Sequence, residues 1–600
     1  MITLSALRHT PQSADCYLDN PHTLHLRVHC ARDEVARAVL WIGDPYDWEI
    51  GGLDGGNLGG GNANNWIGGA AIAMQREGST QLHDCWFASF APPKKRARYG
   101  FILYSKDGRQ TIFLGERRTV DISDPETEKA ELSSIFNLFC LPYLHASDVL
   151  TPPAWVKDTV WYQIFPDRFA NGRPEISPPG TLPWGTEPDQ HNFMGGDLWG
   201  VIDKLDYLRD LGINGLYLTP IFTANANHRY DTTDYFNVDP HLGGNAAFRE
   251  LVQKAHAAGM KVMLDAVFNH MGDQHPIWLD VVEHGAASPY ADWFYIKRFP
   301  VYADTPRHTW DKWNLNYETF GTCFELIKLN TSNPECRQYL LSIARHWVQE
   351  FGIDAWRLDV ANEVEHDFWR DFRKTVRQAR SDCFILAELW HDGMPWLLGD
   401  QFDALMNYPL SEAVLAYFAS HTLSKDAFMR AVDRSYLSYP RNVNQAMFNL
   451  LESHDTSRLM HLCGEDARKA ALAYLFMLTQ AGSPCIYYGG EIGMSGGRDD
   501  GSEANRRCMV WDPQAHNLQL RALIRHTIAL RHRCADFKQA SIQWLYTEHP
   551  DCLAYARGGT RVVINNSEHS ITAIVSGDSY SLQPFGHVID EGREHSGPPT

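Results

Sequence analysis

Residues 353–360 read IDAWRLDV, a short apolar run that ends in an acid. The same pattern ends two other runs, CFILAELW (383–390) and NLLESHD (449–455). A fourth run, KVMLDAVFNH (261–270), also ends in polar side chains. A buried strand that terminates in an acid is typical of the carboxyl rim of a (β/α)₈ barrel, where barrel enzymes hold their reactive groups. This pattern predicts an α/β protein built on a TIM barrel.

Strand-like and helix-like segments alternate on both sides of this stretch. Further strand-like runs are VWYQIF (160–165), INGLYLTP (213–220), FDALMNYPL (402–410) and SPCIYYGGE (483–491), and NLLESHD is the end of a longer run, QAMFNLLESHD (445–455). Helical patterns cover 198–212, 246–260, 334–352 and 367–381. Such alternation predicts a parallel sheet, and eight strand-like runs suit closure into a barrel.

Other strand-rich segments flank the predicted barrel. The segment after the third strand is too long for an ordinary loop and is expected to be functional or a small subdomain. A stretch rich in Gly and Asn, 51–65, is expected to form a loop. We therefore expect an N-terminal β-sandwich at 1–148, the barrel at 149–270 and 332–539, an inserted subdomain at 271–331, and a small C-terminal β-sandwich at 540–600.

Composition excludes several classes of partner. The net charge is −19, from 54 basic and 73 acidic side chains. Nucleic-acid binding needs a basic surface, and an anionic membrane would repel this charge. The chain has no apolar run long enough to span a membrane and no N-terminal pattern of a secretory signal. Its 12 cysteines form no CxxC pair, which favours the reducing cytoplasm.

The acids that end the apolar runs suit one reaction class. Cleavage of a glycosidic bond needs one protonated and one ionised carboxyl group, about 5–5.5 Å apart in retaining enzymes. Asp359 and Glu388 end consecutive predicted strands, which allows such a separation. Arg357 precedes Asp359 by two residues and shares its face of the strand, so its cation can hold the carboxylate ionised. Taken singly, an acid at a strand end is usually a helix cap or a turn residue, and only the alignment of four such strand ends favours the catalytic interpretation.

Four segments together resemble those of a known enzyme family. DAVFNH (265–270), WRLDVANEV (356–364), AELWHD (387–392) and LLESHD (450–455) are similar, in order and spacing, to segments of the α-amylase family, glycoside hydrolase family 13. YQIFPDRFANG (162–172), FMGGDLWGVIDKL (193–205) and HRYDTTDYFNVDP (228–240) add to the match. Within the family, the chain most resembles the group of cyclomaltodextrinases, neopullulanases and maltogenic amylases.

The resemblance implies roles for the residues at the strand ends. Asp359 would be the nucleophile and Glu388 the general acid/base, which must be protonated near neutral pH when substrate arrives. Asp455 would grip hydroxyls of the distorted sugar. The resemblance also implies that His270 and His454 donate hydrogen bonds to that sugar, and that Asp265 orients Arg357.

Further residues match substrate-binding positions of the family. Tyr230 resembles an aromatic platform below the sugar, with His228 beside it. Trp390 is either a stacking wall or a packing residue, and His391 follows it. Asn362 and Glu363 resemble acceptor-side residues, although a helix-start role remains open. Arg506 would fix the far end of the donor cleft, unless it forms only a surface ion pair.

The resemblance implies a retaining hydrolase of α-1,4 bonds, with α-1,6 bonds as a further candidate, in cyclodextrins, maltodextrins or pullulan, with some transglycosylation. A glucan transglycosylase or isomerase on the same scaffold is the first alternative, and a non-catalytic glucan-binding protein the second. It also implies a homodimer formed through the N-terminal domain. Some relatives bind calcium at positions matching Asn171, Gly195 and Asp197. Because Arg173 stands here where an acid would help, we expect no strong calcium binding and no required cofactor.

Overall fold

The computed structural model describes residues 1–48, 66–302, 315–498, 503–539 and 541–591. The Gly/Asn-rich stretch 51–65, expected to be a loop, lies outside the described residues. The chain forms two compact units, one of Met1–Thr151 with Asp426–Asn444 and the other of Pro152–Lys425 with Gln445–Thr600.

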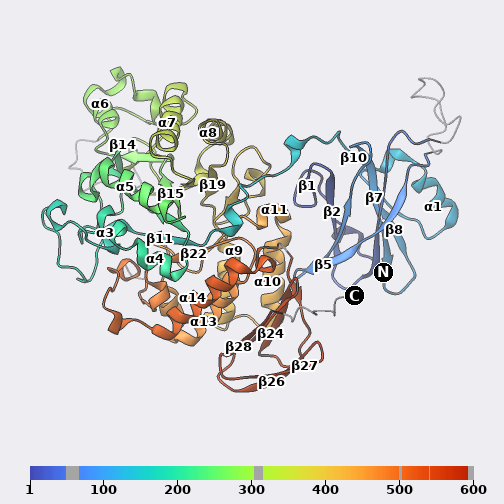
Figure 1. The fold of residues 1–600 in the computed structure, drawn as a ribbon. Coiled ribbons are helices and arrows are strands. Elements are labelled where there is room, and N and C mark those ends of the chain that lie inside the picture. The colour runs from blue at the N-terminus through green and yellow to red at the C-terminus, as the bar shows by residue number, and fades with distance from the viewer. Residues whose placement is uncertain (49–65, 303–314, 499–502, 540, 592–600) are drawn as a thin grey trace. The chain divides into compact units, whose positions relative to one another are not determined.

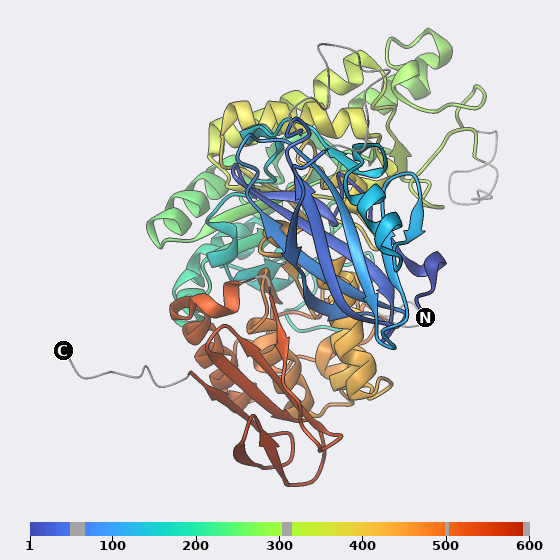
Figure 2. The ribbon, with the colours of Figure 1, turned by 90° about the vertical axis from the view of Figure 1, so that its right-hand side faces the viewer.

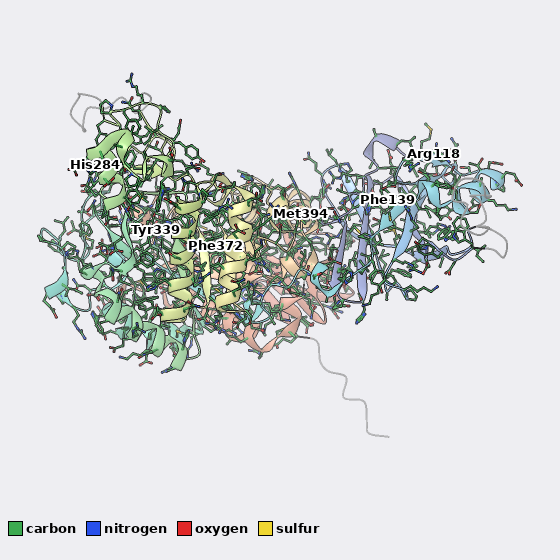
Figure 3. All side chains as sticks on the ribbon, turned by 90° about the horizontal axis from the view of Figure 1, so that it is seen from above. Arg118, Phe139, His284, Tyr339, Phe372 and Met394 are labelled. Carbon is green, nitrogen blue, oxygen red and sulfur yellow. The ribbon has the colours of Figure 1, made fainter. Side chains whose placement is uncertain are left out.

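The first unit contains the β-sandwich that the sequence predicts. One antiparallel sheet has the order β1 (Cys16–Asn20), β2 (Thr23–Ala31), β6 (His83–Phe90), β5 (Gln75–Ser79). The other has the order β4 (Ala70–Ala73), β3 (Val35–Gly43), β7 (Ala97–Ser105), β8 (Thr111–Leu114), β9 (Thr119–Asp121), and β10 (Phe139–Leu141) also pairs with β7. Apolar side chains that alternate along these strands form the core. Phe139, labelled in Figure 3, stacks on Tyr99 within it at 5.3 Å between ring centroids.

Among its described residues, the first unit also contains three α-helices. Helix α1 (Pro125–Leu132) is capped by the Asp124 side chain. Helices α10 (Lys425–Leu437) and α11 (Arg441–Asn444) come from the part of the sequence expected to belong to the barrel. Helix α11 is tied to the sandwich by charge, because Glu77 of β5 lies 2.7 Å from the buried Arg27 of β2 and 2.9 Å from Arg441. Helix α10 contacts the same strand, since the Ser79 amide donates to Asp433 at 2.9 Å. Residues 426–444 therefore pack with the N-terminal domain.

The second unit is built around an eight-stranded parallel sheet. Its strand order is β20 (Ala404–Leu405), β19 (Phe384–Ala387), β18 (Ala355–Leu358), β15 (Lys261–Ala266), β12 (Gly215–Leu218), β11 (Trp161–Ile164), β22 (Ser483–Tyr487), β21 (Phe448–Asn449). A parallel bridge between Met406 and Phe448 joins the two ends of this order. The sheet is thus a closed (β/α)₈ barrel, and each strand lies within a run predicted from the sequence.

Helices surround the barrel strands (Figure 1). They are α2 (Pro166–Phe169), α3 (Leu198–Asp203), α4 (Leu205–Leu211), α5 (Gly244–Ala257), α7 (Pro334–His346), α8 (His366–Ala379), α9 (Tyr408–Val414), α12 (Leu459–Leu462), α13 (Ala467–Leu478) and α14 (Leu518–Arg533). The single helix expected at 198–212 is interrupted at Lys204, whose φ of −108° and ψ of 5° end α3. Phe372 of α8 (Figure 3) packs on Phe268 after β15, at 5.8 Å between ring centroids.

Smaller elements extend the barrel. An antiparallel pair, β13 (Phe222–Ala224) and β14 (Thr232–Val238), follows β12. The described part of the segment after β15 contains the antiparallel pair β16 (His270–Gly272) and β17 (Leu326–Lys328) and helix α6 (Pro276–His284). Figure 2 shows the C-terminal strands in red, which form one sheet of β23 (Gln543–Trp544), β24 (Cys552–Arg557), β25 (Thr560–Asn565) and β28 (His587–Asp590) and a second of β26 (Ile571–Val575) and β27 (Asp578–Leu582).

Two whole-chain expectations concern thiols and membranes. All twelve cysteines are free thiols, and most are buried. Within the described ranges, no helix has both the length and the apolar character needed to cross a membrane.

Candidate active site

One buried arginine connects the carboxyl groups that end three neighbouring strands. Arg357 of β18 has no exposed surface. Its Nη1 lies 2.9 Å from Oδ1 of Asp265 on β15 and 2.7 Å from Oδ1 of Asp359. Its Nη2 lies 2.8 Å from Oε1 of Glu388, which directly follows β19. Asp359 and Glu388 thus converge on a single guanidinium group.

Parallel pairing explains this convergence. Asp265 and Arg357 are paired residues in the register of β15 and β18. The ladders continue past the strands, since the Asp359 amide donates to Ala266 O at 3.0 Å and the Glu388 amide donates to Leu358 O at 3.0 Å. The backbone pairing of three strands therefore fixes the positions of the Cα atoms that carry these side chains.

The electrostatics of this cluster differ from the sequence-based expectation. Arg357 faces Asp265, Asp359 and Glu388, so one cation meets three carboxyl groups away from water. Burial raises the pKa of Asp359 well above its usual value, and the neighbouring carboxyl groups raise it further against the opposing effect of Arg357. Burial likewise raises the pKa of Asp265 to about 6. The cluster therefore favours retention of a proton, rather than full ionisation of Asp359 by Arg357 alone.

Asp455 has the opposite environment. Burial disfavours its ionised form, but His454, Arg506 and Arg498 outweigh burial and lower its pKa. Its Oδ1 lies 2.8 Å from Nη1 of Arg498 and 3.4 Å from Nη2 of Arg506, and its Oδ2 lies 3.2 Å from Nε2 of His454. The third carboxyl group is thus a stable anion.

Neutral histidines and a tyrosine line the same region. Burial lowers the pKa of His228, His270 and His454 to about 3. The Gln163 amide nitrogen donates to Nδ1 of His454 at 2.8 Å, which leaves Nε2 of His454 as the protonated nitrogen. The Tyr230 hydroxyl donates to Asp265 at 3.0 Å, and its ring stacks on His454 at 5.5 Å. These histidines can donate hydrogen bonds without adding charge.

His270 carries an unsatisfied donor or acceptor within the described structure. Its Nε2 is buried and has no hydrogen-bond partner among the described residues, while its ring stacks on Phe320 at 5.4 Å. A buried polar atom without a partner is costly in an empty site. A ligand hydroxyl in the adjoining cavity would satisfy it.

A cavity of about 580 Å³ collects most of the sequence-predicted residues. Its lining includes Asp359, Glu388, Asp455, His228, Tyr230, His270, Trp390, Asn362, Glu363 and Arg506. Arg357, Asp265 and His454 are buried behind this lining. His391 is exposed and does not belong to the cavity lining. Arg506 is mostly buried and pairs with Glu503 at 2.8 Å, which differs from the surface ion pair that the sequence left open.

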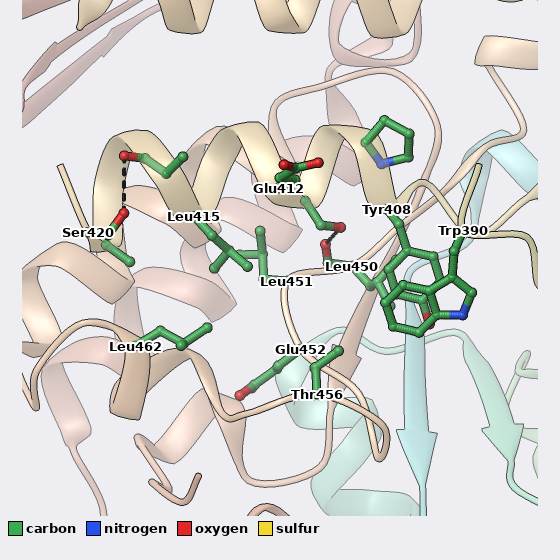
Figure 4. A pocket seen from close by; sticks show the side chains of 14 residues that line it. Trp390, Tyr408, Glu412, Leu415, Ser420, Leu450, Leu451, Glu452, Thr456 and Leu462 are labelled. Atoms are coloured by element: carbon green, nitrogen blue, oxygen red, sulfur yellow. Dashed lines mark hydrogen bonds between the residues drawn. The ribbon is translucent and has the colours of Figure 1, made fainter. Parts of the chain in front are cut away.

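Trp390 stands at the edge of the catalytic cavity. Its side chain is 51% exposed and stacks on Tyr408 of α9 at 3.7 Å and 10°. Figure 4 shows this pair at one end of a second, largely apolar cavity of about 460 Å³, which Leu415, Leu451 and Leu462 also line. An exposed ring held flat by a second ring is suited to stacking on a sugar face.

Several residues of the site were not identified from the sequence. Tyr217 of β12 donates to Asp265 at 2.8 Å, and Gln163 of β11 fixes His454. Both alternate with outward-facing residues on their strands, so the period of two was an available signal. Arg498 had no such signal, because its contact with Asp455 depends on the course of an irregular segment.

The proposed calcium positions have few free oxygen ligands. The Asp197 carboxylate accepts backbone N–H groups of Gly172, Arg173 and Gly200 at 3.1, 2.8 and 2.6 Å. The Asn171 amide donates to Ser177 at 3.2 Å, and its Oδ1 is buried with no hydrogen-bond partner in the described part of the chain. Gly195 contributes no side chain. A calcium ion takes six to eight oxygens at about 2.3–2.6 Å, and these residues do not fit that requirement.

Comparisons with known proteins agree with this geometry. The alpha amylase catalytic domain matches residues 163–546, and the alpha amylase N-terminal ig-like domain matches residues 1–145. A cyclomaltodextrinase of Geobacillus thermopakistaniensis (strain MAS1) is 45% identical over 97% of this chain and 98% of its own length. An intracellular maltogenic amylase of Bacillus subtilis (strain 168) is 44% identical over 88% of this chain and 84% of its own.

A solved cyclomaltodextrinase structure superposes with a TM-score of 0.85, at 39% identity, over 95% of this chain and 92% of that one. The predicted resemblance and barrel fold are therefore confirmed. The chain belongs to the alpha-amylase family of glycoside hydrolases.

Proposed function

We propose that this enzyme hydrolyses α-glucosidic bonds by double displacement, with Asp359 as nucleophile and Glu388 as general acid/base. The observation that carries the assignment is the convergence of both carboxyl groups on Arg357, at 2.7 and 2.8 Å. Two carboxyl groups sharing one guanidinium fit the separation of about 5–5.5 Å that retaining glycosidases use. Burial and the neighbouring carboxyl groups raise the pKa of Asp359, and the 2.7 Å contact with Arg357 opposes them and favours the ionised form that a nucleophile needs.

The reaction divides into two steps. Asp359 attacks the anomeric carbon while Glu388 protonates the departing glycosidic oxygen, and Glu388 then deprotonates the water that releases the glycosyl group. Asp455 stays ionised and accepts hydrogen bonds from sugar hydroxyls. The hydrogen bonds that sugar hydroxyls donate to Asp455 strengthen as positive charge develops on the sugar. The neutral His270 can bind a sugar hydroxyl through its Nε2, while the neutral His454 faces the Tyr230 hydroxyl at 2.7 Å and Asp455 at 3.2 Å and holds both in place.

Cyclodextrins, maltodextrins and pullulan are the proposed substrates, with α-1,4 and some α-1,6 cleavage. The names of the two relatives support cyclodextrin and maltodextrin as substrates. Rates on β-cyclodextrin, pullulan and soluble starch would rank them. Predominant transfer remains the second candidate, because exposed Trp390 offers a stacking face to an acceptor sugar. Products from maltotriose with excess glucose decide between these, and dominance of transfer products would demote hydrolysis.

The assembly, location and metal dependence are also proposals. We infer a homodimer formed through the N-terminal domain, which sedimentation tests directly. A cytoplasmic location is supported by the intracellular relative and the free thiols. No metal is required in this proposal, since the Arg173 guanidinium donates to Gly172 O at 2.7 Å and supplies positive charge to the same loop. Loss of activity in EDTA with recovery in calcium would contradict this.

A trapping experiment tests the nucleophile. A 5-fluoro maltosyl fluoride slows release of the glycosyl group more than its formation, so a covalent enzyme species accumulates. We expect mass spectrometry to locate the label on Asp359, and Asp359→Asn to remain unlabelled. Label on Asp455, or hydrolysis that inverts the anomeric centre, would refute the assignment.

A further inference from the structure

Val360, directly after Asp359, has a left-handed backbone. Its φ is 47° and its ψ is 42°. β-Branched residues rarely adopt this region, because the branched side chain collides with the backbone. Such a conformation persists only where the surrounding structure fixes it, and it is concentrated at functional sites.

The turn that follows Val360 is fixed at several points. The 3₁₀ turn Ala361–Glu363 is closed by the Glu363 amide, which donates to Val360 O at 3.1 Å. Trp369 Nε1 donates to Ala361 O at 2.9 Å, and Lys328 Nζ donates to Glu363 O at 2.6 Å. These hydrogen bonds therefore fix the position of the backbone after Asp359, beside the cavity.

The other side of Val360 is fixed by the acid/base carboxyl group. The Val360 amide donates to Oε2 of Glu388 at 3.2 Å, while Oε1 lies 2.8 Å from Arg357. The Asp359 amide is held by Ala266 O at 3.0 Å. The N–H of Val360 points at Glu388, which fixes the orientation of the peptide group before Val360. From that orientation, the positive φ of Val360 leads the chain into the turn Ala361–Glu363. A negative φ would require either the amide or the turn to move.

We propose that Val360 is a positioning residue whose left-handed backbone aims its amide at Glu388 and so holds the acid/base carboxyl group in place. This inference rests on the proposed function of Glu388. It assigns a role to the backbone rather than to the side chain of Val360. The strain is then part of the active site, because it joins the end of the nucleophile's strand to the carboxyl group of the next strand.

Two substrates that differ in whether their leaving group needs a proton from the enzyme supply a selective test. With maltotriose, the proton of Glu388 passes to the glycosidic oxygen as its bond to C1 breaks and an Asp359 oxygen bonds to C1. With α-maltosyl fluoride, the same C1 bond forms while fluoride departs with its electron pair and needs no proton from the enzyme. A displaced Glu388 therefore slows maltotriose and spares the fluoride in kcat/KM, which reports only this step.

The first variant removes both the amide hydrogen and the positive φ. Val360→Pro is expected to lower kcat/KM for maltotriose by about 30-fold or more, in the range of lost general acid catalysis, and for α-maltosyl fluoride by no more than about threefold. Ser576, with φ 53° in the turn between β26 and β27, is a matched control outside the cavity. Ser576→Pro imposes the same backbone conflict and should leave the ratio of the two rates unchanged.

Two further variants keep the test decisive if Val360→Pro does not fold. The α-hydroxy analogue of valine, introduced at an amber codon, replaces only the N–H of residue 360 by an ester oxygen. It should shift the ratio by about tenfold in the same direction. Val360→Asn, whose side chain tolerates the left-handed region, should preserve the ratio. Equal losses on both substrates, or an unchanged ratio with the ester, would overturn the inference.

Glu388→Gln separates this inference from the proposed function. It should lower kcat/KM for maltotriose much more than for α-maltosyl fluoride. If it does not, the assignment of Glu388 fails. If it does while the residue-360 ester behaves as wild type, only the role of Val360 fails.

Discussion

Strand β18 (Ala355–Leu358) has an aspartate beside each end, and the two carboxyl groups have opposite environments. At the amino end, the Asp354 carboxylate lies 2.7 Å from His256, 2.9 Å from Lys261 and 2.7 Å from Arg380. It also accepts a hydrogen bond from the Val262 amide at 2.9 Å. At the carboxyl end, Asp359 shares a single arginine with two other carboxyl groups. The difference separates a carboxylate that stabilises the barrel from one that is available for chemistry.

The pKa shifts express the same contrast. Burial opposes ionisation of Asp354, yet hydrogen bonds from His256, Lys261 and the Val262 amide, with the charge of Arg380, lower its pKa. Burial raises the pKa of Asp359. At neutral pH the ionised Asp354 therefore stabilises the fold, whereas ionisation of Asp359 costs stability. This is the division expected in a TIM barrel, between a supporting face and a catalytic face.

The largest expected effect is on activity at the carboxyl end. Asp359→Asn should lower kcat/KM on maltotriose by about 10⁴-fold or more, since an amide cannot form the covalent intermediate. Thermal unfolding should be unchanged or slightly improved, because Arg357 keeps Asp265 and Glu388 as partners. If Asp359→Asn keeps near-normal turnover, or is severely destabilised, then Asp359 does not differ from Asp354 in the way proposed here.

The reciprocal substitution should affect stability instead. Asp354→Asn leaves Lys261, Arg380 and the His256 imidazole around a neutral amide. The loss should cost about 2–3 kcal/mol of unfolding free energy, below the full cost of breaking a buried pair because these partners are partly exposed. The activity of the folded fraction should remain near that of the wild type, as Asp354 is remote from the cavity lining. Asp382→Asn is the matched control, because Asp382 is half exposed and pairs with Arg380 at 3.0 Å. Its effect should be below about 1 kcal/mol.

Acid pH should reduce the difference between wild type and Asp354→Asn. The folded pKa of Asp354 is lowered, so its stabilisation is complete above the ordinary aspartate value of about 3.9 and is lost as pH falls through the folded value. Unfolding temperatures measured from pH 6 down to the acid limit of solubility should therefore converge. A constant gap across that range would show that Asp354 contributes through packing rather than charge.

The sequence was sufficient for the barrel because each strand is a short apolar run. It also predicted that Asp359 and Glu388 lie together, because parallel strands share a carboxyl edge, while their catalytic roles stay predictions. It did not distinguish Asp354 from Asp359 by their roles in stability, since that depends on His256 and Arg380 from other elements. It also placed residues 426–444 in the barrel, whereas Arg441 reaches Glu77 of the N-terminal sandwich. Ion pairs between residues so far apart in the chain cannot be predicted from the periodicity of the sequence.

The smallest expected effect concerns the rim of the cavity. Trp390 is half exposed and rests on Tyr408, so Trp390→Ala removes one stacking face and little core. Loss of an aromatic contact of about 0.5–1.5 kcal/mol corresponds to a rise of roughly 2- to 10-fold in the concentration of glucose needed for half-maximal transfer. Trp390→Phe should restore part of this, because it keeps a flat ring on Tyr408. If Trp390→Ala instead lowers the unfolding temperature as much as Asp354→Asn, Trp390 is a packing residue, and the functional face of the barrel ends at the carboxyl groups.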